Sequence, residues 1–132
     1  MIYGIGTDIA EVDRIAEALR VYGEQFERRV FSDEEIAYCR RTPRRMAERY
    51  AARFAAKEAF SKAIGTGMSR GIRWRDIVVL RKPGGRPTLD LRGEAGRRSA
   101  GMRAHLSLTH TDTTAMATVI LELEESREEL RQ

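Results

Sequence analysis

The sequence predicts an α+β domain in which antiparallel strands pack against one long central helix and several shorter helices. Three observations favour this class. Segments near both ends of the chain alternate apolar with small or polar residues, as strands do. A middle stretch rich in alanine and arginine contains no glycine or proline, which favours a long helix. Polar or glycine-containing turns separate the later strands, which predicts hairpins and therefore antiparallel pairing.

In the first half of the chain, one strand precedes the helices. The strand covers Ile2 to Ile9, where two glycines leave one of its faces bare. Apolar residues then recur at helical spacing from Val12 to Tyr22. A capping-box pattern predicts a short helix over Ser32 to Arg41. The long helix is expected from about Arg45 to Ile64, because Gly65 is a typical helix stop.

The second half is expected to consist mainly of strands. A weak helix is expected from Glu94 to Met102, and a charged tail, frayed or helical, from about residue 124 to 132. A turn at Pro83 to Pro87 should reverse the chain, and a polar turn should join the last two strands into a hairpin. Strands are expected at Trp74 to Arg81, Thr88 to Leu91, His105 to Thr109 and Ala115 to Glu122.

Length and composition narrow the class of protein. At 132 residues the chain fits a single domain spanning 1–132. Cys39 is the only cysteine, so it cannot form an internal disulfide. No segment resembles a signal peptide, and no apolar run approaches the roughly 20 residues that span a bilayer. We therefore expect a cytoplasmic protein that does not enter the membrane.

Arginine dominates the positive charge of the chain. Its 24 Lys and Arg against 20 Asp and Glu give a net charge of +4 and an isoelectric point near 9.6. The planar arginine side chain suits carboxylates and phosphates. Acidic residues are mixed among the arginines, whereas nucleic-acid-binding proteins more often carry blocks of one sign. A small basic module that binds nucleic acid without catalysis still stays open as an alternative.

Asp8 is the first candidate functional residue. It ends the first strand on the face where Gly4 and Gly6 have no side chains, so a bulky ligand could lie against that backbone. A structural role is equally compatible with the local sequence, because Asp8 followed by Glu11 also fits a helix N-cap with a capping box.

Glu58 and Lys62 are the next candidates, one turn apart in the predicted long helix. They border a face made only of alanines, which would allow close approach of another backbone or of a ligand. A carboxylate and an ammonium at this spacing could hold a metal ion and a phosphate. The alternative is a surface salt bridge, which would be worth only about 0.3 to 0.5 kcal/mol.

A third group of polar residues lies on one face of the strand that begins at His105. Ser107 and Thr109 share this face, and an anion could use such a row of donors. A hydrolase triad is disfavoured, because the chain lacks the G-x-S-x-G turn that presents a nucleophilic serine. Two histidines without a cysteine partner make a poor zinc site, and a lone strand histidine is usually structural.

Together these segments resemble a known family. They are G-I-G-T-D at Gly4 to Asp8, F-A-A-K-E-A-F-S-K-A-I-G-T-G at Phe54 to Gly67, and H-L-S-L-T-H at His105 to His110. In this order and spacing, the chain resembles the holo-acyl-carrier-protein synthases, the short class of 4'-phosphopantetheinyl transferases. The resemblance covers nearly the whole chain except the charged tail, and it implies the 4'-phosphopantetheinyl transferase-like fold.

The resemblance also implies a reaction and its cofactor. The phosphopantetheine arm of coenzyme A would be transferred to a serine of an apo acyl carrier protein, leaving adenosine 3',5'-bisphosphate. Magnesium would be bound by Asp8 and Glu58, and a hard cation there would offset the charge that gathers on the pyrophosphate. Lys62 would lie near the pyrophosphate and act in catalysis with these two carboxylates. A water oriented by Asp8 or Glu58 is the hypothesised base.

The remaining expected coenzyme A contacts come from the same resemblance. Arg45 and Arg53 are candidates for the 3'-phosphate, and His105 for the nucleotide end. The turn of Gly85, Arg86 and Pro87 would lie near the adenine, and Gly65 near the bound coenzyme.

The implied partners are an acidic carrier protein and further copies of this chain. Acyl carrier proteins present their target serine at the start of an acidic helix, and complementary charge would speed the encounter. Arg14 and Arg20 lie on the solvent side of the first helix, and Arg28 and Arg29 follow closely. Of these, Arg14, Arg20 and Arg28 are expected to meet the carrier. Members of the family form trimers with active sites between subunits, and they support fatty acid or polyketide synthesis.

Overall fold

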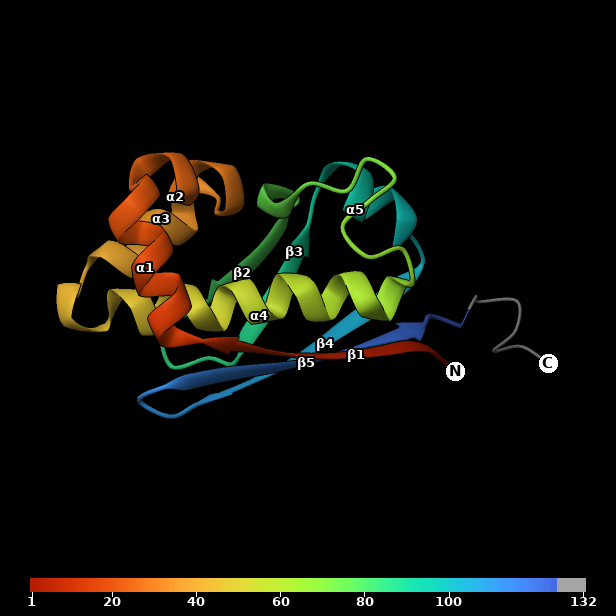
Figure 1. The fold of residues 1–132 in the computed structure, drawn as a ribbon. Helices are drawn as coiled ribbons and strands as arrows, with labels where there is room; N and C mark the ends of the chain where they lie inside the picture. The colour runs from red at the N-terminus through yellow and green to blue at the C-terminus, as the bar shows by residue number, and fades with distance from the viewer. Residues whose placement is uncertain (126–132) are drawn as a thin grey trace.

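The computed structural model describes residues 1–125, and the rest of the predicted tail lies outside the described residues. The two elements labelled η are short turns of 3₁₀ helix. None of the described helices is both long and apolar enough to cross a membrane. In chain order, the elements are β1 (Ile2–Glu11), α1 (Val12–Tyr22), α2 (Glu24–Val30), α3 (Asp33–Arg40), η1 (Pro43–Arg45), α4 (Met46–Ile64), η2 (Trp74–Asp76), β2 (Ile77–Arg81), β3 (Pro87–Leu91), α5 (Gly93–Arg98), β4 (Met102–His110) and β5 (Thr114–Leu123) (Figure 1).

The strands pair only in antiparallel fashion and form two sheets within the described chain. One sheet has the order β1-β5-β4 and contains the predicted β4–β5 hairpin. The other consists of the β2–β3 hairpin. Figure 1 shows α4 lying along the three-stranded sheet, with α1, α2 and α3 gathered over one end of α4. The predicted α+β class with a long central helix is confirmed, but its strands are divided between two sheets.

Two glycines of β1 allow α4 to pack directly on the strand backbone. A Cβ atom on Gly4 would lie 2.0 Å from the Ala63 carbonyl oxygen, and one on Gly6 would lie 1.9 Å from the Ala59 carbonyl oxygen. No side chain fits at such distances. The prediction that a bulky ligand lies against this bare strand face is therefore wrong, because the helix occupies the space.

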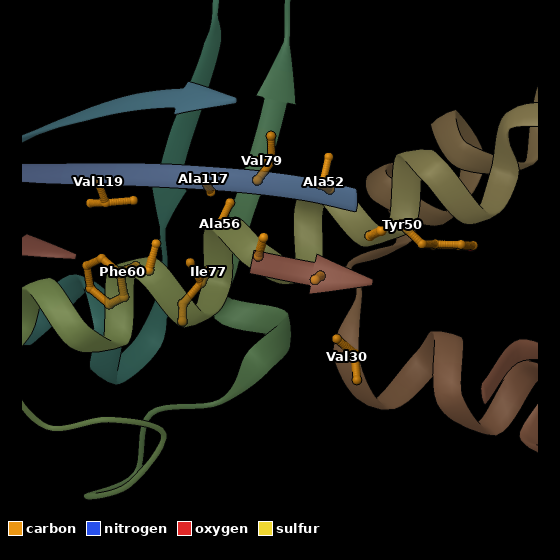
Figure 2. Close-up of a cluster of buried hydrophobic side chains, with 14 of the residues drawn as sticks. Val30, Tyr50, Ala52, Ala56, Phe60, Ile77, Val79, Ala117 and Val119 are labelled. Carbon is orange, nitrogen blue, oxygen red and sulfur yellow. The ribbon is translucent and has the colours of Figure 1, made fainter. Parts of the chain in front are cut away.

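The alanine face of α4 is part of the main hydrophobic core. Figure 2 shows Ala56 and Phe60 of α4 close to Ala117 and Val119 of β5. All four side chains are fully buried. Their small size lets helix and sheet approach closely, which the sequence predicted as one of two uses for this face.

A buried ion pair ties the opposite side of α4 to α3 and β2. Lys57 Nζ donates to Glu35 Oε1 at 2.7 Å, and both side chains are completely buried. Lys57 also donates to the backbone oxygens of Trp74 and Ile77, and Glu35 accepts from the amide of Val79 at 3.1 Å. These contacts fix the rotation of α4 about its axis, and with it the direction in which neighbouring Glu58 points.

The structure overturns several local expectations. Asp8 is not a helix cap: it pairs with Ala117 within β1, and Glu11 is the N-cap of α1. Sheet pairing thus overrode the capping pattern. Helix α2 was not predicted; Gly23, which follows α1, also directly precedes this second helix. Helix α5 ends early because Met102 belongs to β4.

Candidate active site

Asp8 lies near the end of β1, on the sheet face that α4 covers. Its neighbours in the same row are Ala117 of β5 and Leu108 of β4. The Asp8 side chain is 12 % exposed. Beyond the tight contact of the two glycines, β1 and α4 line a hollow that contains both Asp8 and Glu58. The close packing of the glycines therefore brings the end of the strand to the carboxylate on the helix.

Lys62 connects α4 to the same strand. Its Nζ atom lies 2.9 Å from Asp8 Oδ1 and donates to the Thr7 backbone oxygen at 3.1 Å. The simple alternative was an ion pair between Glu58 and Lys62 along the helix. Among the described residues, the ion pair of Lys62 instead crosses to Asp8, so strand and helix contribute to one charged cluster.

The two carboxyl groups of this cluster influence each other. Burial raises the pKa of Glu58 above its usual range, and the negative charge of Asp8 and a hydrogen bond with it act in the same direction. Lys62 opposes this effect. The hydrogen bond and charge of Asp8 raise the pKa of Lys62. Two carboxylates so placed ionise together more readily when a cation is close to both.

This donor set fits a hard divalent cation. Magnesium is usually bound by one or two carboxylates, and water and substrate phosphate oxygens complete its coordination. Asp8 and Glu58 supply two carboxylates from separate elements, and a bound cation would offset the burial and the charge of Asp8, which together raise the pKa of Glu58. No cluster of three or more candidate metal ligands occurs within residues 1–125, so the other ligands would have to come from solvent or substrate.

The predicted phosphate ligands Arg45 and Arg53 line a different hollow, of about 200 Å³. Arg53 is only 5 % exposed, its guanidinium carbon lies 4.3 Å from the centre of the Tyr38 ring, and its Nε atom has no hydrogen-bond partner within residues 1–125. A buried arginine nitrogen without a partner is costly unless an anion or water reaches it.

Sequence reasoning missed three further basic residues that line this hollow. Arg49, Arg81 and His110 also line it, together with one acid, Glu48. Arg49 could have been found, because it lies midway between Arg45 and Arg53 at four-residue spacing on one helix face. His110 ends the H-L-S-L-T-H segment of β4 but was given no role of its own, and Arg81 of β2 carried no local signal.

His105 lies on the opposite face of the three-stranded sheet from Asp8. It shares a row with Ile120 and Ile5, and its Nε2 atom lies 3.1 Å from Glu122 Oε1. Since side chains alternate between faces along a strand, one copy of the chain does not bring His105 to the carboxylate pair. The predicted row of polar donors is present, as His105, Ser107 and Thr109 are all exposed.

The two glycine turns predicted to lie near coenzyme A are found at the end of α4 and at the end of the β2–β3 hairpin. Gly65 ends α4 with a φ of 94°, a left-handed conformation that suits glycine, and it is exposed just beyond Lys62. Gly85 and Arg86 form the exposed end of the β2–β3 hairpin, and Pro87 begins β3.

The three arginines expected to meet a carrier are exposed on α1 and α2. Each forms an ion pair with a glutamate three or four residues earlier in the chain. Arg14 is 3.4 Å from Glu11, Arg20 is 2.5 Å from Glu17, and Arg28 is 3.5 Å from Glu24. Such exposed pairs contribute roughly 0 to 1 kcal/mol, so an approaching carboxylate can replace them.

Comparison with known proteins gives consistent results. The sequence model of the 4'-phosphopantetheinyl transferase superfamily matches residues 4–119. A holo-[acyl-carrier-protein] synthase of Koribacter versatilis is 50% identical over 125 residues, which cover 92% of this chain and 99% of the relative. One of Sphingopyxis alaskensis is 50% identical over 129 residues, covering 92% of this chain and 97% of the relative.

Solved structures agree with the sequence relatives. A Bacillus anthracis holo-(acyl-carrier-protein) synthase in complex with coenzyme A (3',5'-ADP) has a TM-score of 0.80 at 36% identity, covering 94% of this chain and 99% of that one. The holo-[acyl-carrier-protein] synthase of Neisseria meningitidis has a TM-score of 0.82 at 34% identity, and the match covers 92% of this chain and 99% of that one. These relatives give no support to the nucleic-acid-binding alternative. The chain belongs to the 4'-phosphopantetheinyl transferase superfamily and, within it, to the holo-[acyl-carrier-protein] synthases.

Proposed function

We propose that this protein transfers the 4'-phosphopantetheine arm of coenzyme A to a serine of an apo acyl carrier protein. Adenosine 3',5'-bisphosphate is the second product. The observation that carries the proposal is the cluster of Asp8, Glu58 and Lys62, which assembles two carboxylates and an ammonium from β1 and α4. The names of the relatives, and the coenzyme A present in the Bacillus anthracis structure, support it.

The reaction breaks the phosphoanhydride of coenzyme A and forms a new phosphate ester with the serine. The serine oxygen attacks the pantetheine-bearing phosphorus of the pyrophosphate, the bond from that phosphorus to the bridging oxygen breaks, and the nucleotide leaves with that oxygen. The serine proton passes to a water that Asp8 or Glu58 orients. Magnesium, held by Asp8 and Glu58, would neutralise charge on the pyrophosphate oxygens. Lys62 contacts the pyrophosphate and stabilises the leaving group.

Nucleotide recognition is assigned to residues away from this cluster. Arg45 and Arg53 bind the 3'-phosphate, because their hollow is strongly cationic and Arg53 has an unpartnered buried nitrogen among the described residues. His105 contacts the nucleotide end. The turn of Gly85, Arg86 and Pro87 lies near the adenine, and Gly65 lies near the coenzyme.

A homotrimer explains how residues on opposite sheet faces serve one site. His105 and Asp8 can contribute together only if they come from different copies of the chain. The outer face of the three-stranded sheet carries exposed apolar residues, among them Tyr3 at 49%, Ile5 at 60% and Ile9 at 63% exposure. Such a face is typical of an interface, and its use would bring the His105 face of one protomer to a neighbour.

The acidic helix of the carrier docks on α1, where Arg14 lies beside the hollow that contains Asp8 and Glu58. Arg20 and Arg28 extend the positive charge along the same side. Complementary charge raises the encounter rate more than the final affinity. We place the reaction in the cytoplasm, in the activation of carriers for fatty acid or polyketide synthesis.

The proposal is tested by incubating the protein with coenzyme A, magnesium and an apo carrier, followed by the intact mass of the carrier. We expect the carrier to gain one phosphopantetheine, with adenosine 3',5'-bisphosphate appearing in equal amount. A carrier whose target serine is replaced by alanine should gain nothing. Absence of any mass gain with a panel of apo carriers would refute the proposal.

A further inference from the structure

The hollow assigned to the 3'-phosphate is lined by more positive charge than the two predicted arginines supply. It lies where the end of α3 and the first half of α4 meet strands β2 and β4. Ala52 and Val79, both labelled in Figure 2, line its apolar side. Among the described residues, Glu48 is the only acid that lines it, and the basic residues are Arg45, Arg49, Arg53, Arg81 and His110.

Two of these arginines, Arg49 and Arg53, lie one turn apart on α4 and form no ion pair within residues 1–125. Each donates instead to a backbone oxygen. Arg49 Nη1 donates to the Tyr38 oxygen at 3.2 Å, and Arg53 Nη1 donates to the Arg49 oxygen at 3.2 Å. Like charges at this helical spacing repel each other. Since the buried Nε atom of Arg53 also lacks a partner among the described residues, the pair is suited to receive an anion.

Tyr38, near the end of α3, contacts both guanidinium groups. The centre of its half-buried ring lies 4.6 Å from the guanidinium carbon of Arg49 and 4.3 Å from that of Arg53. A cation within about 6 Å of the centre of a tyrosine ring is attracted to the face of the ring. The Tyr38 hydroxyl forms no hydrogen bond within the part of the chain that the structure describes, so the ring provides the side-chain contact to the two arginines.

We propose that Tyr38 is a positioning residue that holds Arg49 and Arg53 for the 3'-phosphate of coenzyme A, and that Arg49 is a further ligand of this group. The inference rests on the proposed function, which assigns the 3'-phosphate to this hollow. The phosphate accepts from the unpartnered Nε atom of Arg53 and offsets the repulsion between the two arginines. Because both guanidinium groups are in place before binding, capturing the phosphate requires little further ordering of side chains.

The arrangement selects coenzyme A over the same molecule without its 3'-phosphate. The test therefore compares initial rates of carrier modification with coenzyme A and with 3'-dephospho-coenzyme A, at saturating carrier and magnesium. For the wild type we expect the KM for the dephospho form to be at least about ten-fold higher. Tyr38→Leu should raise the KM for coenzyme A about ten-fold, equivalent to about 1.4 kcal/mol, and leave the turnover number and the KM for the dephospho form unchanged. Tyr38→Phe keeps the ring and should behave like the wild type.

Arg49→Gln should cause the same selective rise in the KM for coenzyme A. The double variant Tyr38→Leu/Arg49→Gln should raise this KM by less than the product of the two single effects, because Tyr38 acts through the arginines. The matched control is Arg41→Gln, since the guanidinium carbon of Arg41 lies 5.8 Å from the centre of the same ring but Arg41 does not line the hollow. It should leave both KM values unchanged. If circular dichroism shows that Tyr38→Leu is unfolded, the selectivity of Arg49→Gln decides the test.

The inference is overturned if Tyr38→Leu or Arg49→Gln raises the KM for both forms of the coenzyme equally, since a general disturbance of the fold would do the same. It is also overturned if either variant behaves like the Arg41→Gln control, or if Tyr38→Phe loses selectivity as Tyr38→Leu does. Equal KM values of the wild type for the two coenzymes would overturn it as well. In all these cases the carrier is still modified. Failure of the wild-type protein to modify any carrier would instead refute the proposed function.

Discussion

Gly6→Ala tests the close contact on which the geometry of the site depends. The added Cβ would lie 1.9 Å from the Ala59 carbonyl oxygen, so strand and helix must separate by about 1.1 Å to reach even 3.0 Å. Overpacking of a well-packed core costs typically 1 to 3 kcal/mol, and a backbone clash is at the upper end, about 3 kcal/mol. For a domain of this size we expect the melting temperature to fall by roughly 10 °C.

The assay is thermal unfolding at fixed protein concentration, together with transfer kinetics below the melting temperature. Thr7→Ala is the matched control, because Thr7 is the next residue and its side chain lies on the exposed sheet face. It loses a hydrogen bond to the Ala117 oxygen, worth about 1 kcal/mol, and a longer, exposed contact of 3.4 Å with the Thr118 hydroxyl. The double variant Gly6→Ala/Ala59→Gly should not recover stability, since the clash involves a backbone atom rather than the Ala59 side chain.

Separation of β1 from α4 should also impair catalysis. Asp8 lies two residues beyond Gly6, and its position relative to Glu58 depends on the same contact. We expect the turnover number of the folded Gly6→Ala protein to fall more than its affinity for the carrier. If Gly6→Ala melts like the wild type and only weakens coenzyme A binding, the glycine face receives a ligand and our account of the packing is wrong.

Three further perturbations test other parts of the account. Glu58→Gln should abolish transfer, yet in metal-free buffer at pH 7 it should raise the melting temperature, because the raised pKa of Glu58 means that its ionised form destabilises the folded state. The wild-type protein should lose stability as pH rises through that pKa, and the same pH profile in the variant would contradict this. Lys57→Met should lower the free energy of unfolding in urea by about 3 to 5 kcal/mol, because it leaves Glu35 buried without its partner. Lys57→Met/Glu35→Gln should lower it by less than the sum of the two single changes, and additive losses would argue against a coupled pair. Ile5→Lys should leave the circular dichroism spectrum unchanged but reduce the mass in light scattering to that of one chain, whereas Ile5→Val should keep the mass of the wild type. An unchanged mass in Ile5→Lys would exclude this sheet face as the interface.

Much of the fold could be predicted from local patterns. The strand at Ile2, the capping box at Ser32 and the glycine stop at Gly65 all lie in the predicted places. Each of these signals depends on residues close in sequence. Helix α2 was missed for the same reason, because its boundary with α1 is a single glycine with no separate capping side chain.

The site was less accessible to sequence reasoning, since its geometry depends on contacts between distant elements. The spacing of Glu58 and Lys62 suggested an ion pair along α4, but the strand contact draws Lys62 to Asp8. The glycines of β1 indicated open space, and only the packing of α4 explains them. The position of His105 on the opposite sheet face could be read from strand alternation only once the register of β4 was known.

The central claim is that Asp8 and Glu58 act together as the metal-binding carboxylates of phosphopantetheine transfer. The most direct measurement is the intact mass of an apo carrier after reaction with coenzyme A over a magnesium titration, for wild type, Asp8→Asn and Glu58→Gln. We expect metal-dependent modification by the wild type and none by either folded variant at the metal concentration that saturates the wild type. Modification by either variant at the wild-type rate and metal dependence would contradict the claim.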